Sequence, residues 1–99
     1  MIFVQELFMT DIASRADIVV GVKSAYEKTG VYVNAMRRLH LSQPLVKSDL
    51  PDDWEVLTLL DQKMGGDANY KTSKDVWEEV QKVAYRRFSG ADYHRLEKH

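Results

Sequence analysis

Two short apolar runs near the start of the chain constrain its fold more than any other feature. Residues 2–8 (IFVQELF) and 17–22 (DIVVGV) are rich in β-branched and aromatic side chains, which favours strands. Between them, Thr10 or Asp11 can cap a short helix by accepting a backbone hydrogen bond. The second run is continuous rather than alternating, which is typical of a strand covered on both faces. The sequence therefore predicts a strand–helix–strand piece of an α/β sheet.

The next segment, residues 26–40 (YEKTGVYVNAMRRLH), combines a glycine, a β-branched and aromatic run, and two arginines. Gly30 suits a turn with positive φ. Residues 31–36 have the propensity of a strand. Residues 37–46 are less regular and contain Pro44, so they are expected to run extended over the surface. Together these features predict a short extended hairpin.

The second half of the chain carries helical signals. Asp52 stands three residues before Glu55, which is the spacing of a capping box. Gly65 and Gly66 end the helix that follows. Apolar residues recur in this helix at spacings of three and four, so they share one face. They are Trp54, Leu57, Leu60 and Met64.

A second helix repeats this design, with Ser73 as a candidate N-cap and Gly90 as the stop. The linker at 65–72 (GGDANYKT) is short enough for the two helices to pack against each other. Residues 91–99 begin a third helix that has no stop signal. The apolar stripe of the second helix consists of Trp77, Val80, Ala84 and Phe88, widened by Val76 and Val83.

The composition fits one small folded domain. The 99 residues are 44% hydrophobic and 29% charged, values of an ordinary globular α/β or α+β protein. Residues 1–49 are β-rich and residues 50–99 are helical, but neither part carries enough apolar residues for its own core, so we treat them as a single domain. We expect a strand–helix–strand piece of a Rossmann-like sheet, a short extended hairpin, and two to three packed C-terminal helices.

Charge and hydropathy exclude two classes of partner. The net charge of -1 gives no field that would attract nucleic acid. No apolar run approaches the roughly 20 residues that span a bilayer.

The sequence offers little catalytic chemistry. It has no cysteine, which excludes disulfides, thiolate nucleophiles and thiolate ligands for zinc or iron–sulfur clusters within this chain. The three histidines, His40, His94 and His99, lack partners at metal-binding spacing. We therefore expect no catalytic residue and no metal site. The pair Arg37 and Arg38 follows a predicted strand, where it can grip a phosphate or carboxylate bidentately or serve only as a surface charge pair.

Taken in order, the segments match the motifs of a known family. Residues 4–20 fit V-Q-D-x-F-x-T followed by A-D-V-V-L-P, and residues 26–40 fit A-E-K-x-G-T-x-x-N-x-E-R-R-x-Q. Residues 52–65 fit D-W-x-I-x-x-x-L-A-x-x-M-G, and the helical stretches at 70–80 and 88–99 follow in the same order. The whole chain thus resembles an internal segment of the large subunits of molybdopterin oxidoreductases. These include formate dehydrogenase alpha subunits and the G-type subunit of NADH–quinone oxidoreductase (NADH dehydrogenase).

The resemblance implies a role inside a longer oxidoreductase. The parent protein would carry out electron transfer, and this chain would be a structural segment that is not catalytic by itself. The parent family binds molybdopterin guanine dinucleotide and iron–sulfur clusters, none of them held within this chain alone. Asn34, Arg37 and Arg38 would contact the dinucleotide cofactor or a neighbouring domain. The partners would be the remaining domains of the parent subunit and other subunits of an oxidoreductase complex, in the cytoplasm or peripheral on a membrane complex.

Three departures from the family motifs alter polar positions near the expected cofactor-facing region. Gly21 and Val22 replace Leu-Pro, Met36 replaces the acidic residue before the arginines, and His40 replaces the usual glutamine. They favour a diverged member, or one that lost its metal site as the G-type subunit did.

The open helical end of the sequence suggests a fragment excised from a longer chain. Such a fragment would expose an apolar surface and form a homo-oligomer in isolation. The alternative is a stand-alone α/β interaction module that binds a protein partner through Tyr26, Tyr32, Arg37 and Arg38.

Overall fold

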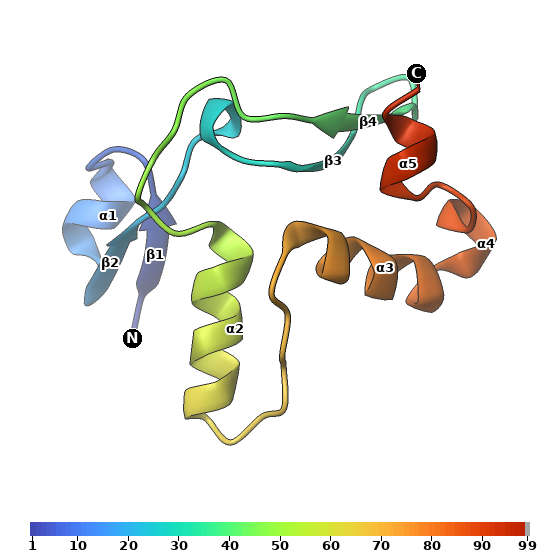
Figure 1. The fold of residues 1–99 in the computed structure, drawn as a ribbon. Helices are drawn as coiled ribbons and strands as arrows, with labels where there is room; N and C mark the ends of the chain where they lie inside the picture. Colours follow the sequence, from blue (N-terminus) through green and yellow to red (C-terminus); the bar gives the residue numbers. More distant parts are fainter. Residues whose placement is uncertain (99) are drawn as a thin grey trace.

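Strands and helices are mixed along the chain, as the sequence predicts. The computed structural model describes residues 1–98, so His99, at the end of the predicted third helix, lies outside the described residues. The elements in order are β1 (Phe3–Glu6), α1 (Asp11–Arg15), β2 (Ile18–Gly21), a 3-10 turn (Ala25–Glu27), β3 (Gly30–Val33), β4 (Leu39–Ser42), α2 (Asp53–Lys63), α3 (Ser73–Val83), α4 (Tyr85–Phe88) and α5 (Tyr93–Leu96). In Figure 1 the hairpin β3–β4 and helix α2 lie between the N-terminal strands and the C-terminal helices.

The N-terminal unit, β1–α1–β2, confirms the predicted strand–helix–strand piece. β1 and β2 pair in parallel, in register from Phe3 opposite Ile18 to Glu6 opposite Gly21. Thr10 is the N-cap of α1, and its hydroxyl accepts a hydrogen bond from the Ala13 backbone N–H at 3.2 Å. The cap that the sequence predicts is therefore formed.

The prediction that the second strand is covered on both faces is wrong for this chain. Ile18 is 44% exposed and Val19 is 38% exposed, although they point to opposite faces of the sheet. Among the described residues the sheet that contains β2 has two strands, and α1 is the one helix in the connection between them. The described chain therefore supplies too few neighbours to bury both faces.

The predicted hairpin is confirmed. β3 and β4 are antiparallel, with Gly30 opposite Ser42 and Val33 opposite Leu39. The turn with positive φ that we expect at Gly30 is wrong, because Gly30 is the first residue of β3. The positive φ instead occurs at Arg37, at 62°, inside the loop between the two strands.

Helix α2 begins with the predicted capping box and ends at the predicted glycines. The backbone N–H of Asp52 donates to the Glu55 carboxylate at 3.3 Å, and Gly65 adopts a φ of 90° just beyond the helix. Its apolar stripe is largely exposed, with Leu57 at 54% and Met64 at 79%. Within the described residues α2 makes no extensive contact with α3, so the predicted packing of these helices against each other is not formed.

The C-terminal helices close around Trp77. Its ring nitrogen donates to the Ala91 carbonyl at 2.7 Å, and its ring centroid lies 5.3 Å from that of Phe88. The hydroxyl groups of Ser73 and Tyr93 are 2.8 Å apart, which ties the start of α3 to α5. This small cluster is the main core of the second half of the molecule.

Two details of the second predicted helix need correction. Its N-cap is Thr72 rather than Ser73, since the Thr72 hydroxyl accepts from the Asp75 backbone N–H at 3.3 Å. The helix also does not continue to Gly90, because Ala84 leaves helical geometry at φ -113° and ψ 46° and separates α3 from α4. This break lets the chain turn so that Phe88 meets Trp77.

None of the described helices combines the length and the apolar character that a bilayer crossing requires.

Candidate functional site

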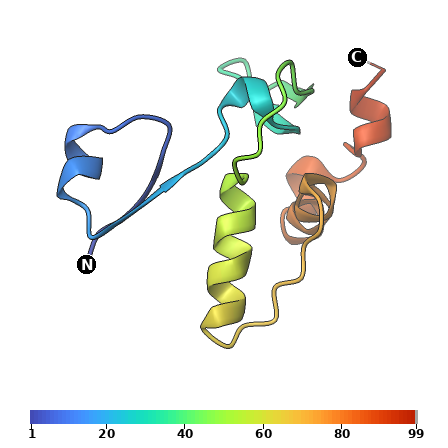
Figure 2. The same cartoon turned by 60° about the vertical axis from the view of Figure 1, so that its left-hand side comes forward.

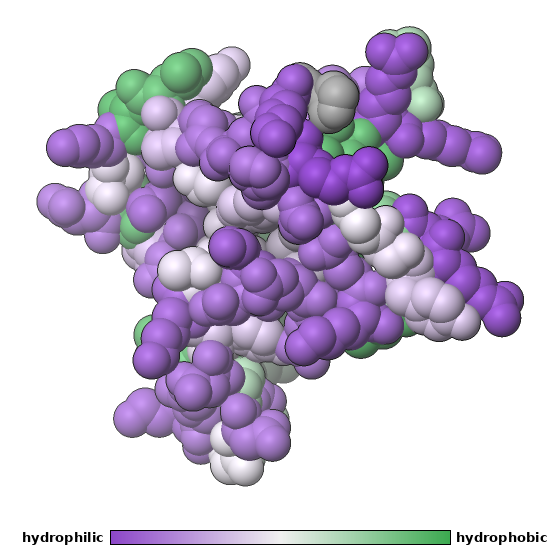
Figure 3. Space-filling model, turned by 45° about the vertical axis from the view of Figure 1, so that its right-hand side comes forward, coloured by the Kyte–Doolittle hydropathy of each residue, from purple (hydrophilic) through white to green (hydrophobic). Residues whose placement is uncertain are grey.

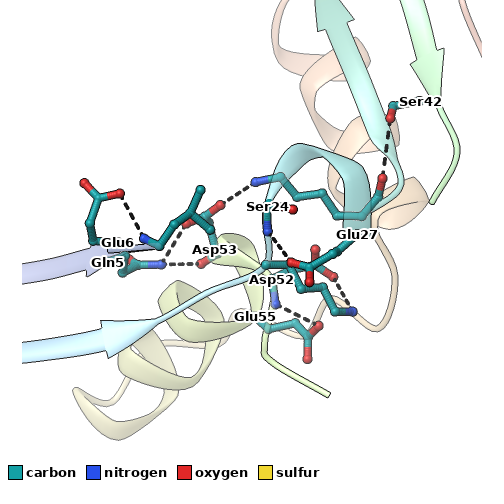
Figure 4. A network of polar contacts seen from close by, with 11 residues as sticks. Gln5, Glu6, Ser24, Glu27, Ser42, Asp52, Asp53 and Glu55 are labelled. Atoms are coloured by element: carbon teal, nitrogen blue, oxygen red, sulfur yellow. Dashed lines mark hydrogen bonds and ion pairs between the residues drawn. The ribbon is translucent and has the colours of Figure 1, made fainter. Parts of the chain in front are cut away.

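A polar junction joins the N-terminal unit, the hairpin and α2 (Figure 4). The ammonium of Lys28 lies 2.7 Å from a carboxylate oxygen of Asp53, the first residue of α2. The side-chain amide of Gln5, on β1, donates to the Asp53 carbonyl at 3.2 Å. Asp53 therefore links a strand, the segment before β3 and a helix start at one point.

Asp52, the residue before, is a second part of this junction. One of its carboxylate oxygens lies 3.6 Å from the Lys23 ammonium, while the other is buried without a hydrogen-bond partner among the described residues. Burial, together with the nearby Glu55 carboxyl, raises the pKa of Asp52, and Lys23 only partly opposes this. The negative charge of Asp52 is thus the least well compensated charge in the junction.

The two other shifted groups of the junction lie on the segment before β3. Burial disfavours the charge of Lys28, but the hydrogen bond and charge of Asp53 outweigh it, so the pKa of Lys28 lies above its usual value. The backbone N–H of Ser24 donates to the Glu27 carboxylate at 2.7 Å and holds the pKa of Glu27 below its usual value. Both residues are therefore held charged by contacts within the chain.

Asn34 organises the hairpin loop. Its side-chain oxygen accepts hydrogen bonds from the backbone N–H groups of Met36 and Arg38, each at 2.9 Å. Its amide nitrogen lies 2.9 Å from the His40 ring. These bonds within the loop support the left-handed backbone at Arg37, which only a small fraction of residues other than glycine adopt.

Arg37 and Arg38 differ from Asn34 in having no such contacts. Both side chains are exposed, and among the described residues neither guanidinium forms a hydrogen bond or an ion pair. Two adjacent guanidiniums on a tightly held loop can bind an external phosphate or carboxylate. The structure thus brings the three predicted site residues onto one loop and gives them different roles there.

A groove that the sequence did not reveal lies between β3, the start of α2, α3 and α5. It encloses about 380 Å³ and its edge includes the Lys28–Asp53 pair. Its apolar and aromatic lining includes Tyr32, Trp54, Val76, Trp77, Val80 and Tyr93. The sequence places each tryptophan on the apolar stripe of its own helix. Since four separate elements supply the lining, no local pattern could have indicated a shared groove.

The described residues contain no group of three or more histidine, cysteine, aspartate or glutamate side chains placed to hold a metal ion. His40 is taken up by its contact with Asn34.

No family model matches this chain, but relatives match almost all of it. It is 34% identical over 100 residues to the F420-dependent formate dehydrogenase 1 subunit alpha of Methanococcus maripaludis, covering 97% of this chain and 15% of the relative. The corresponding alpha subunit of Methanocaldococcus jannaschii is 34% identical over 97 residues, covering 94% of this chain and 14% of the relative. Formate dehydrogenase H of Escherichia coli is 31% identical over 98 residues, covering 97% of this chain and 14% of the relative. The chain thus spans about a seventh of the length of these relatives.

Proposed function

We propose that this chain, a homologue of one segment of formate dehydrogenase alpha subunits, is a structural segment of a longer molybdopterin-type oxidoreductase subunit. The observation that carries the proposal is the end-to-end match at 31–34% identity to alpha subunits and to formate dehydrogenase H. The names of these relatives favour the formate dehydrogenase branch over the G-type subunit of NADH–quinone oxidoreductase.

A structural role is supported by what the motif residues do. Glu27 binds the Ser24 backbone, Lys28 pairs with Asp53, and Asn34 shapes the hairpin loop. Each of these contacts is made within the chain and holds elements together. Residues of the resemblance that could have been assigned to chemistry thus serve the fold, and the redox chemistry belongs to the rest of the parent.

The cofactors of the parent family suggest what Asn34, Arg37 and Arg38 could contact. Molybdopterin guanine dinucleotide and iron–sulfur clusters, when bound, supply the electron transfer of such an enzyme. The chain has no thiol for a cluster. Arg37 and Arg38, however, are exposed and have the chemistry to hold an anion, either a phosphate of the dinucleotide or a carboxylate of a neighbouring domain. Asn34 would hold the loop that presents them.

The first test is the size of the native polypeptide, detected in source cells with an antibody against this segment. We expect a band several times heavier than 11.4 kDa, with formate-dependent dye reduction in the purified protein. A band at 11.4 kDa would contradict the proposal and favour the stand-alone interaction module, for which the exposed Tyr26 offers a contact surface.

The second test addresses the arginines in the native polypeptide. The double variant Arg37→Ala/Arg38→Ala is compared with Arg86→Ala/Arg87→Ala, which removes another exposed adjacent pair on α4. We expect only the first variant to lower bound pterin content or formate-dependent activity. Loss of pterin would indicate contact with the dinucleotide, and loss of stability with normal pterin content would indicate a carboxylate of a neighbouring domain. Equal behaviour of the two variants would show that Arg37 and Arg38 are an ordinary surface pair.

A further inference from the structure

We propose that His40 holds the arginine loop, residues 34–38, in place through Asn34, and that it does so only while its imidazole ring is neutral. His40 is thus a positioning residue, and the order of the loop falls on acidification. That the loop binds an anion rests on the proposed function, whereas the contacts that hold the loop lie within residues 34–40.

The orientation of the Asn34 amide is fixed by the backbone of the arginine loop. Its Oδ1 atom accepts hydrogen bonds from the N–H groups of Met36 and Arg38, each at 2.9 Å. Exchanging the oxygen and the nitrogen of this amide would place its NH2 group against these two donors. The NH2 group therefore points to the remaining partner, the Nε2 atom of the His40 ring at 2.9 Å.

The protonation state of the His40 ring follows from this orientation. An amide NH2 group only donates, so Nε2 must accept, and a neutral imidazole that accepts at Nε2 carries its proton on Nδ1. A protonated imidazole donates from both nitrogens. Two donors would then meet across 2.9 Å, and since His40 is exposed, its ring can turn away into water. The contact with Asn34 thus exists only while His40 is neutral.

The surroundings of His40 offer a protonated ring no ion pair in exchange. Among residues 1–98, no carboxylate forms an ion pair with it. Tyr32 is its partner across the hairpin, and α5 packs against β4. Figure 3 turns forward the right-hand side of Figure 1, where α5 lies, and shows a largely hydrophilic surface with separate hydrophobic patches. The titratable and charged groups on β3, the arginine loop and α5, none of them a carboxylate, are Tyr32, Arg37, Arg38, Tyr93, His94 and Arg95, and Glu97 and Lys98 follow α5.

Release of His40 loosens the part of the loop that most needs support. Arg37 has a φ of 62°, a backbone conformation that residues other than glycine rarely adopt. The Asn34 side chain bridges the backbone on both sides of Arg37, because it accepts from Met36 and Arg38. His40 holds the other end of this side chain. Without that contact the Asn34 side chain is freer to rotate, and the loop opens more often.

The residue that the family motif has at this position predicts a different behaviour. His40 stands where the motif has glutamine. The amide oxygen of glutamine accepts a hydrogen bond and does not titrate. Histidine in place of glutamine therefore makes the support of the arginine loop sensitive to pH in this chain, and His40→Gln is the conservative variant that should remove this sensitivity.

Amide hydrogen exchange in the native polypeptide tests the proposal directly. It is measured at about pH 8 and about pH 5, at the two ends of the range in which histidine usually changes charge, and is corrected for the intrinsic pH dependence of exchange. In the wild type we expect the Met36 and Arg38 amides to lose protection by about threefold to tenfold at the lower pH, the fold-change that one hydrogen bond carries. His40→Gln should keep the same protection at both pH values. An equal pH response of the wild type and His40→Gln would overturn the proposal.

Two further variants separate the position of His40 from the general effect of a histidine. His94→Gln removes another exposed histidine, on α5, and should respond to pH as the wild type does. His40→Phe keeps a ring without an acceptor, so at about pH 8 it should lower the protection of the Met36 and Arg38 amides as acid does in the wild type. The proposal is wrong if His40→Phe is as protected as the wild type at that pH, or if His94→Gln abolishes the pH response.

The tautomer of His40 gives a reading that does not depend on the stability of the loop. In native polypeptide labelled at histidine, the nitrogen NMR signals of His40 are those that disappear in His40→Gln. We expect the proton of the neutral ring on Nδ1. A proton on Nε2 would contradict the proposal, because Nε2 could not then accept from Asn34.

The outcomes separate this inference from the proposed function. If Arg37→Ala/Arg38→Ala changes neither pterin content nor stability while the loop amides respond to pH as described, the arginines bind no anion of the parent and His40 still positions the loop. If the arginine variant behaves as proposed while His40→Gln responds to pH like the wild type, the anion contact stands and the role of His40 is wrong. A native band at 11.4 kDa overturns the proposed function alone, because the exchange experiment applies equally to that polypeptide.

Discussion

The two ends of the molecule hold similar kinds of apolar residues and bury them to very different extents. In the N-terminal unit the buried residues are the small Ala13 and Val22, while Phe8 and Ile12 stay exposed. At the other end Trp77, one of the largest side chains, is buried at 9% exposure. Figure 2 shows the two regions well apart, with α2 between them. Apolar content alone therefore does not decide whether a segment forms a core.

The difference lies in how many neighbouring elements pack against each region within the described residues. The Trp77 ring donates to the Ala91 carbonyl and lies tilted at 51° to the Phe88 ring. Helices α3 and α5 also contact strands β3 and β4 of the hairpin. A parallel pair of strands cannot close in this way, since it needs further strands and covering helices from elsewhere. The C-terminal helices thus bury Trp77 with the help of the hairpin, whereas among the described residues the N-terminal strands are covered mainly by α1.

The largest expected effect comes from opening the C-terminal core. Trp77→Ala removes the buried ring, its contact with Phe88 and its hydrogen bond to Ala91. We expect a loss of about 3–5 kcal/mol in the free energy of unfolding, from urea denaturation followed by far-UV circular dichroism.

The matched control for this variant is Val83→Ala on the same helix. Val83 is 80% exposed, so the change is expected within about 0.5 kcal/mol of the wild type. A Trp77→Ala protein as stable as Val83→Ala would show that the C-terminal region is no better packed than the N-terminal unit, and the comparison would fail.

A smaller effect is expected from placing a larger side chain at Ala13, the most buried residue of the N-terminal unit. Ala13 is 2% exposed where α1 meets the sheet, so Ala13→Leu must displace its neighbours. We expect a cost of about 1–3 kcal/mol, with faster hydrogen exchange confined to β1 and β2. Ile12→Leu, at a position 62% exposed, is the control and is expected to be neutral. If Ala13→Leu is also neutral, α1 packs loosely and the unit has no tight core at all.

Features that depend on a few neighbouring residues could be predicted from the sequence. The Thr10 cap, the Asp52 capping box and the glycine end at Gly65 each need only residues within about one helical turn. The error at the start of α3 was one residue, because Thr72 and Ser73 are adjacent hydroxyl residues and both can cap.

Features that depend on distant contacts could not be predicted. The exposure of Ile18 and Val19 follows from the lack of further neighbouring strands within residues 1–98. The groove beside Trp54 and Trp77 forms because four elements meet there. The break at Ala84 occurs without a glycine or proline, and it accompanies the contact of Phe88 with Trp77. The sequence groups Asn34, Arg37 and Arg38 as one predicted site, and only the structure shows that the Asn34 side chain bonds within the loop while the two guanidiniums are exposed.

The smallest expected effect is at the polar junction that joins the N-terminal unit to the hairpin and α2, and its sign follows from the pKa of Lys28. That pKa is raised above 10.5 in the folded chain, so the ion pair with Asp53 contributes its full stability below that pH and loses it as the pH rises through the folded pKa.

Lys28→Met is expected to cost about 0.2–1 kcal/mol at neutral pH, because Asp53 stays 45% exposed to water and keeps its contact with Gln5. The variant should also flatten the fall in unfolding free energy above pH 10.5, measured by urea titration across the alkaline range. Lys74→Met, at an exposed position of α3, should keep the wild-type slope. If Lys28→Met keeps that slope too, the Lys28–Asp53 pair contributes nothing to stability, and the junction is held by its other contacts, such as those of Gln5 with Asp53 and of Lys23 with Asp52.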